Sequence, residues 1–216
     1  MNRIQRITLP ALLTVLALAT APTIFAAPQT AKPAKEGKEN KAQLATGTWS
    51  VDKSHTDIGF SVTHLGVSKT RGAFTDFDGV IKADGAKPEN SSVSFTIKTA
   101  SVNTGNTQRD EHLRSKDFFD VATYPEITFK STKIAKSKNG FVATGNLTMH
   151  GVTKTVALPF TVAGPAKGFK GELHMGVDTA LTLSRKEYAL LWPAPVEASG
   201  AVGDAVNITI SMEMIK

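Results

Sequence analysis

The feature that most constrains this chain is an alternation of apolar and polar residues with a period of two, which recurs from residue 46 onward. Successive side chains of a β-strand point to opposite faces of a sheet, so the alternation predicts strands with one apolar face. The residues that share the mainly apolar face of each segment are Ile58, Phe60, Val62 and His64; Val93, Phe95 and Ile97; Ile127 and Phe129; Phe141, Ala143, Gly145, Leu147 and Met149; Val152, Val156, Leu158, Phe160 and Val162; Leu173, Met175, Val177 and Leu181; and Val206, Ile208, Ile210, Met212 and Met214. Turn-forming residues separate these segments. About eight antiparallel strands of this kind predict an all-β sandwich or barrel.

The interior of such a barrel has two possible contents. About eight strands enclose either a filled core or room for one small ligand. The inward positions mix bulky Phe and Val with Ala143 and Gly145, and they include the adaptable Met212 and Met214. The pattern alone leaves both a packed core and a ligand cavity open.

The first residues have the character of a targeting segment. Arg3 and Arg6 precede a long apolar run, and Ala26 and Ala27 offer a small-residue cleavage site. Two prolines interrupt the run and no basic cluster follows it, which argues against an uncleaved membrane anchor. We therefore expect a signal peptide over residues 1–26 and a periplasmic protein with no transmembrane anchor after cleavage.

Residues 27–45 differ in composition from the rest of the chain. They are rich in Ala, Lys, Pro and Gln and contain no aromatic residue, which predicts a disordered linker before a domain over residues 46–216. The chain carries a net charge of +6, of which the signal contributes two charges and the linker two more, so the domain is only about +2. This small excess argues against a nucleic-acid partner.

One segment breaks the strand pattern. Residues 104–120, TGNTQRDEHLRSKDFFD, are highly charged and end in two adjacent aromatic residues. They predict a short helix over residues 106–118, with Thr107 as its N-cap and Asp110 three residues later in a position similar to that in a capping box.

These stretches carry a family resemblance. The segments WSVDKSHTDIGFSVTHLGVSKTRGAFTDFDGVI, SVNTGNTQRDEHLRSKDFFDVATYPEITFKST, GNLTMHGVTKTVALPF and VGDAVNITISME occur in the order found in the YceI-like family of secreted bacterial proteins, which the chain resembles over roughly residues 48–215. The resemblance implies an extended, eight-stranded, antiparallel, lipocalin-like barrel with a short helix in one long connection. It further implies a hydrophobic tunnel for a long amphiphile such as a polyisoprenoid, an isoprenoid quinone or a fatty amide, no enzymatic activity, and a possible homodimer.

The resemblance also suggests where a ligand would lie. An apolar chain would occupy the tunnel, while Arg109 and Arg114 would meet a phosphate and His112 a quinone oxygen, with Asp110 orienting an arginine. The complete set of predicted ligand-binding residues is Phe60, Val62, His64, Phe95, Ile97, Arg109, Asp110, His112, Arg114, Phe118, Phe119, Phe129, Leu147, Met149 and Phe160.

Structural roles explain several of these residues equally well. Arg109 and Asp110 would then tie the helix to neighbouring loops, the Asp110 carboxylate would favour the helix dipole, and Phe118 and Phe119 would plug the barrel. His64 would be a satisfied interior histidine.

Other functions leave weaker traces. The five histidines are not paired at metal-binding spacings, there is no cysteine, and no nucleophile elbow or P-loop appears, so we predict no catalytic residue, no metal and no cofactor apart from the lipid. Two alternatives remain: a scavenger of lipophilic toxins or antibiotics that uses the same tunnel, and a packed-core interaction protein without a ligand.

One segment departs from the family pattern. Arg185 and Tyr188 are followed by Ala189 where the family usually has Gly, and Ala restricts the backbone more. The next residues, LLWPAP, form an apolar loop. Either it packs against the rim of the barrel, or it serves as a lid or a dimer contact.

Overall fold

The computed structural model describes residues 43–216. The predicted signal peptide and most of the predicted linker lie outside these residues. The strands are β1 (Gly47–His64), β2 (Ser68–Phe74), β3 (Phe77–Ala83), β4 (Ser92–Lys98), β5 (Val102–Asn103), β6 (Glu126–Ser137), β7 (Gly140–Met149), β8 (Val152–Lys167), β9 (Leu173–Ser184) and β10 (Val202–Ile215). The helices are α1 (Thr107–Arg114) and α2 (Ala194–Ser199), with single 3-10 turns at Pro88–Asn90, Thr99–Ser101 and Lys186–Tyr188.

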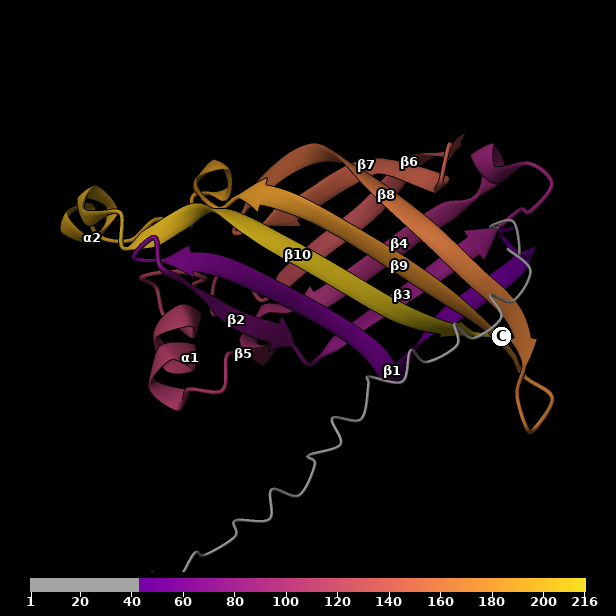
Figure 1. The fold of residues 1–216 in the computed structure, drawn as a ribbon, viewed down its shortest axis with the longest axis horizontal. Helices are drawn as coiled ribbons and strands as arrows, with labels where there is room; N and C mark the ends of the chain where they lie inside the picture. Colours follow the sequence, from indigo (N-terminus) through magenta and orange to yellow (C-terminus); the bar gives the residue numbers. More distant parts are fainter. Residues whose placement is uncertain (1–42) are drawn as a thin grey trace, which may run out of the picture. The chain divides into compact units, whose positions relative to one another are not determined.

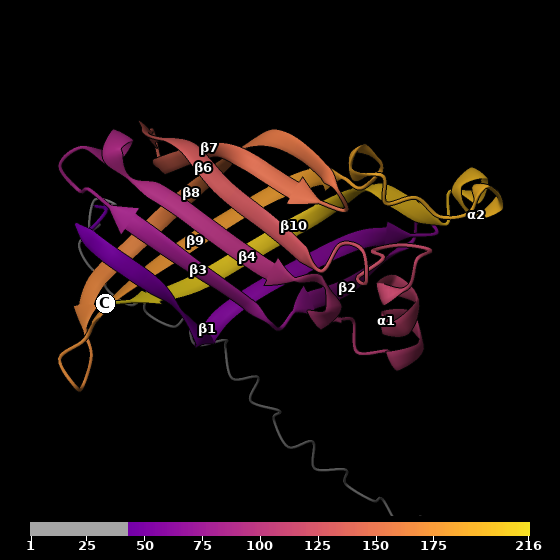
Figure 2. The same cartoon turned by 180° about the vertical axis from the view of Figure 1, so that it is seen from behind.

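The strands close into a barrel (Figures 1 and 2). Within residues 43–216, eight antiparallel strands form the ring in the order β1, β3, β4, β6, β7, β8, β9 and β10, and β10 pairs with β1 to complete it. β1 is long enough to pair with β3 at its start and with β2 at its end, and β5 extends the sheet beyond β2. The predicted eight-stranded, lipocalin-like barrel is confirmed.

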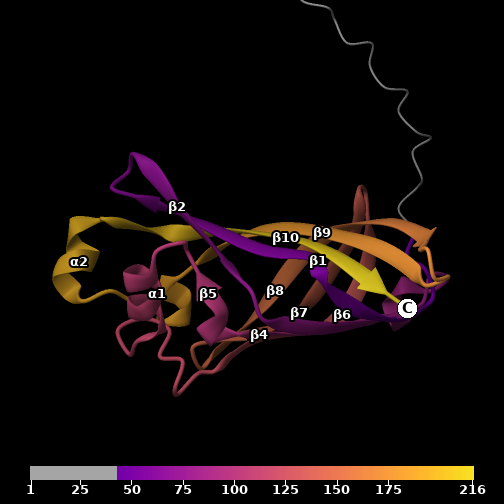
Figure 3. The same cartoon turned by 90° about the horizontal axis from the view of Figure 1, so that it is seen from below.

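The two ends of the barrel differ. Figures 1 and 3 show α1 and α2 at one end together with β2 and β5, and the C-terminus at the other. At the C-terminal end, Trp49, Met175 and Met214 are almost fully buried and fill the barrel. At the α1 end, a second apolar cluster includes Leu113 and Phe119.

The folded part begins slightly before residue 46. Leu44 is 2% exposed and packs in the core, and the carbonyl oxygen of Ala45 accepts a hydrogen bond of 2.8 Å from the indole nitrogen of Trp49. The last residues of the predicted linker are therefore held against the barrel by the packing of Leu44 and by the hydrogen bond between Ala45 and Trp49.

α1 has different ends from those predicted. Its N-cap is Asn106 and not Thr107, because the Asn106 side chain accepts the Arg109 backbone N–H at 3.0 Å. The helix stops at Arg114, four residues before the predicted end, where Ser115 adopts an extended conformation. Phe118 and Phe119 lie in the turns after the helix. Among residues 43–216, no helix has both the length and the apolar character needed to cross a membrane.

Candidate functional site

The barrel encloses a cavity of about 750 Å³. Its wall is formed by the inward faces of the strands, and side chains such as Phe60 and Phe95 keep part of their surface accessible because they border this space. The packed-core alternative is therefore wrong for the central part of the barrel. A cavity of this size and apolar character is typical of small-molecule and lipid sites.

The aromatic residues leave the cavity open because they lie against glycines. A Cβ atom placed on Gly79 would collide with the ring of Phe95, its partner across β3 and β4. The same holds for Gly72 and Phe60, across β2 and β1. These rings cover strand backbone that has no side chain of its own, and so they take up less of the interior.

The structure places most of the predicted site residues around the cavity. Thirteen of the fifteen border it: Phe60, Val62, His64, Phe95, Ile97, Arg109, His112, Phe118, Phe119, Phe129, Leu147, Met149 and Phe160. Asp110 and Arg114 do not. His64 borders the cavity but is exposed at the end of β1, so it is not an interior histidine.

One side of the cavity wall is absent from the set of predicted site residues. β9 and β10 contribute Val177, Thr179, Leu181, Leu183, Val202, Val206, Ile208, Ile210 and Met212. Their alternation was visible in the sequence, and it would have identified most of these residues had it been applied to all the strands. Leu190 and Trp192 also border the cavity, but they lie in the apolar loop at residues 190–195, where apolar and polar residues do not alternate with a period of two.

Arg109 is the cationic side chain of α1 that borders the cavity. Its Nε donates to the Thr104 hydroxyl at 2.7 Å and its Nη2 to the Thr104 carbonyl at 3.1 Å. The buried Asp110 carboxylate accepts bonds from the backbone N–H and the hydroxyl of the same Thr104, at 2.8 and 2.6 Å. Asp110 and Arg109 thus share Thr104 as a hydrogen-bond partner, and through it Asp110 can orient Arg109.

Arg114 has a structural position. Its Nε donates to the Ala100 carbonyl at 2.7 Å and its Nη2 to the Val102 carbonyl at 2.6 Å. These bonds tie α1 to the first residue of β5 and to the 3-10 turn just before it. The prediction that Arg114 contacts a head group is therefore replaced by the structural alternative.

An aromatic rim covers the cavity at the α1 end. Trp192 stacks on Phe118, with ring centroids 4.7 Å apart, and lies edge-on to His112 at 5.0 Å. The apolar loop at residues 190–195 therefore packs on the rim of the barrel, which was the first of the two roles considered for it. The imidazole ring of His112 therefore packs against Trp192 and also borders the cavity, where its nitrogens are polar groups.

A buried ion pair fixes this loop. The guanidinium of Arg185, a residue only 3% exposed, binds both carboxylate oxygens of Glu197, and Glu197 also accepts the Trp192 backbone N–H at 2.8 Å. Ala189 adopts a left-handed conformation with φ 55°, which accounts for the glycine usual at this position in the family pattern.

The ion pair predicts a pH dependence of stability. Hydrogen bonds from Arg185 and then from the Trp192 N–H lower the pKa of Glu197 from 4.5 to about 2. A lowered pKa stabilises the folded state above the unfolded pKa, so this contribution is present above pH 4.5 and is lost as the pH falls toward 2. Denaturant unfolding between about pH 5 and pH 2.5 should show a smaller loss of stability for Glu197→Gln than for the wild type. Equal losses would contradict this assignment.

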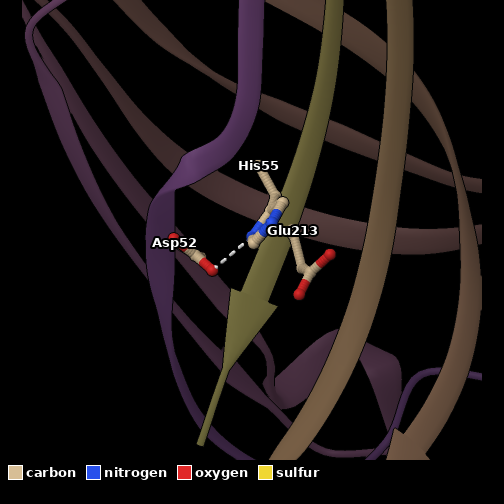
Figure 4. A group of neighbouring side chains, drawn as sticks. All are labelled: Asp52, His55 and Glu213. Carbon is tan, nitrogen blue, oxygen red and sulfur yellow. Dashed lines mark hydrogen bonds and ion pairs between the residues drawn. The ribbon is translucent and has the colours of Figure 1, made fainter. Parts of the chain in front are cut away.

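One group of side chains outside the cavity has metal-ligand chemistry. Among the described residues, Asp52, His55 and Glu213 bring three ligand atoms within 4.8 Å of one another, on β1 and β10 (Figure 4). None of the three borders the cavity.

Comparisons with known proteins agree with this architecture. A model of the YceI-like domain matches residues 49–214. A UPF0312 protein of Pseudomonas savastanoi pv. phaseolicola is 38% identical over 195 residues, covering 83% of this chain and 98% of the relative.

Solved structures show the same fold. The YceI protein of Campylobacter jejuni is 36% identical with a TM-score of 0.62, covering 77% of this chain and 96% of that one. BcnA of Burkholderia cenocepacia is 29% identical with a TM-score of 0.68, covering 76% and 98%. A polyisoprenoid binding domain from Saccharophagus degradans shares only the fold, at 16% identity and a TM-score of 0.60, covering 79% and 98%.

Proposed function

The chain belongs to the YceI-like family, and from this premise we propose that it binds one long amphiphilic isoprenoid, a polyprenyl lipid or an isoprenoid quinone, inside its barrel. The observation that carries the proposal is the lining of the site: an apolar cavity of about 750 Å³ that Arg109 and His112 of α1 border. The apolar chain lies in the cavity and the polar head lies at the rim.

The energetics favour such a ligand. Each methylene removed from water contributes about 0.8 kcal/mol, so a flexible hydrocarbon chain gains affinity in proportion to the length that enters the barrel. Ordering the chain costs part of this gain. The head group does not follow, because an unpaired polar group in an apolar cavity loses its hydrogen bonds to water.

The proposed role is carriage or sequestration in the periplasm, without a catalytic step. The periplasmic location is inferred only from the predicted signal peptide over residues 1–26. A permissive apolar cavity also suits the second role considered, a scavenger of lipophilic compounds. A homodimer remains a proposal drawn from the family resemblance.

The test is native mass spectrometry of the protein purified from its own periplasm, followed by organic extraction. A stoichiometric isoprenoid or quinone supports the proposal. A protein that carries no lipid, and that takes up neither an added long-chain polyprenol nor a ubiquinone, contradicts it. Preferential retention of added lipophilic antibiotics over isoprenoids would favour the scavenger.

Arg109 provides a finer prediction about the head group. Its bonds to Thr104 use Nε and Nη2, and we assign Nη1 to the ligand. We expect Arg109→Gln to weaken binding of a polyprenyl phosphate about tenfold, the effect of one charge-assisted hydrogen bond, with little change for the uncharged polyprenol. Tryptophan-quenching titrations with both lipids would measure this.

The matched control is Arg71→Gln, which removes one exposed charge from β2 without touching the cavity wall. If both variants weaken phosphate binding equally, the effect is general electrostatics and Arg109 does not contact the head group.

A further inference from the structure

The seam between the first and last strands brings two carboxylates together. Asp52 on β1 and Glu213 on β10 are direct partners in the antiparallel pairing that closes the barrel. The neighbouring residues Val51 and Met214 are buried, so Asp52 and Glu213 lie on the outer face. Like charges directly opposite each other destabilise a strand pair. The position therefore favours a cation.

An irregularity in β1 places an imidazole beside these carboxylates. Between Asp52 and Asp57 the chain advances five residues while its partner on β10 advances only from Glu213 to Ser211. The extra residues leave the ladder, and within them His55 turns back so that its Nδ1 lies 2.8 Å from Asp52 Oδ2. Figure 4 shows the ring above the seam, with the Glu213 carboxylate on its other side.

A second histidine, His174, forms a hydrogen bond with Glu213. His174 on β9 hydrogen-bonds Glu213 through Nδ1, and its Nε2 lies 3.3 Å from a carboxylate oxygen of Glu172. Such an outer partner orients a metal-binding carboxylate. The titratable groups of this cluster are thus three carboxylates and two imidazoles. Hydrogen bonds to the carboxylates of Asp52 and Glu213 raise the pKa of His55 and of His174 respectively.

We propose that Asp52, His55 and Glu213 form a binding site for a divalent first-row transition-metal ion, for which Zn²⁺ is the simplest probe. Imidazole nitrogen and carboxylate oxygen are ordinary zinc ligands, whereas Ca²⁺ and Mg²⁺ prefer oxygen alone. The three ligand atoms lie within 4.8 Å of one another, and the His55 side chain is 65% exposed, so an ion can reach it from solvent.

The ion would link the first and last strands of the barrel. It joins β1 to β10 where the irregularity interrupts their backbone pairing, and three protein ligands leave a position for water or for a donor from another molecule. The site lies outside the cavity, so the inference stands or falls independently of lipid binding.

Isothermal titration of the metal-free protein with Zn²⁺ at neutral pH tests the site. We expect one ion per chain, at least tenfold weaker binding by His55→Ala and by Glu213→Gln, and no heat with Ca²⁺. Asp178→Asn is the matched control. Asp178 is an exposed carboxylate on β9 that accepts a hydrogen bond from Ser211, and Ser211 lies on β10 two residues from Glu213. This variant should bind Zn²⁺ like the wild type.

Thermal unfolding gives a second measurement. Zn²⁺ should raise the melting temperature of the wild type and of Asp178→Asn, but not of His55→Ala or Glu213→Gln, since an ion that binds only the folded state stabilises it. Absence of Zn²⁺ binding by the wild type, or equal binding by all the variants, would overturn the proposal.

Discussion

Replacing Arg185 with methionine is expected to lower the free energy of unfolding by about 3–5 kcal/mol, the usual cost of leaving one partner of a buried ion pair alone. The change removes the buried guanidinium from the Glu197 carboxylate, which keeps only the partly exposed Lys186 as a charged partner. It also removes donors to the carbonyl oxygens of Leu190, Val202 and Gly203, which Arg185 binds at 2.8 to 3.0 Å. Urea unfolding, followed by circular dichroism, would measure the loss.

Lys186→Met is the control for this prediction. Lys186 also pairs with Glu197, at 3.1 Å, but its side chain is 47% exposed, so its removal should cost less than about 1 kcal/mol. In Arg185→Met we also expect the fluorescence of Trp192 to shift to longer wavelength as the loop loosens, while Trp49 remains buried. Equal losses for the two variants would show that Arg185 does not fasten the loop.

Placing a charge in the cavity wall is expected to abolish lipid binding. Ile208 on β10 borders the cavity, and its neighbours across the strands are the apolar residues Phe60 and Leu181. We expect Ile208→Glu to weaken binding of a long-chain polyprenol by at least about 100-fold, because a carboxylate holds water in the space that the chain must fill. A lipid-uptake titration would show the loss.

The adjacent residue provides the matched control. Thr209 is exposed on the outer face of the same strand, and Thr209→Glu introduces the same charge without entering the cavity. It should bind polyprenol like the wild type, and circular dichroism would establish that both variants remain folded. Normal uptake by a folded Ile208→Glu would place the ligand elsewhere.

The barrel itself could be predicted because its signal is local. The alternation of Ile58, Phe60 and Val62 in β1, or of Phe95 and Ile97 in β4, fixes which face of a strand is apolar before any partner is known. All five of these residues border the cavity. The signal weakened where the period of two ended, at Leu190 and Trp192.

Polar roles were harder to assign, because they depend on what lies within hydrogen-bonding distance. Arg109 and Arg114 occupy the same charged segment and looked equivalent in sequence. One borders the cavity while the other binds the carbonyls of Ala100 and Val102. Arg185 was identified from the family pattern, but its partner Glu197 lies in the short helix α2, which the sequence pattern did not predict.

The sequence by itself determined the main strands, their apolar faces and the family, since each is encoded by residues close together in the chain. Only the tertiary structure decided that the interior stays open, because this depends on rings such as Phe95 lying over Gly79 on another strand. It alone also brought Asp52 and His55 to Glu213, more than 150 residues away in the sequence. Barrel closure, and not chain proximity, sets such distances, since it joins the first strand to the last.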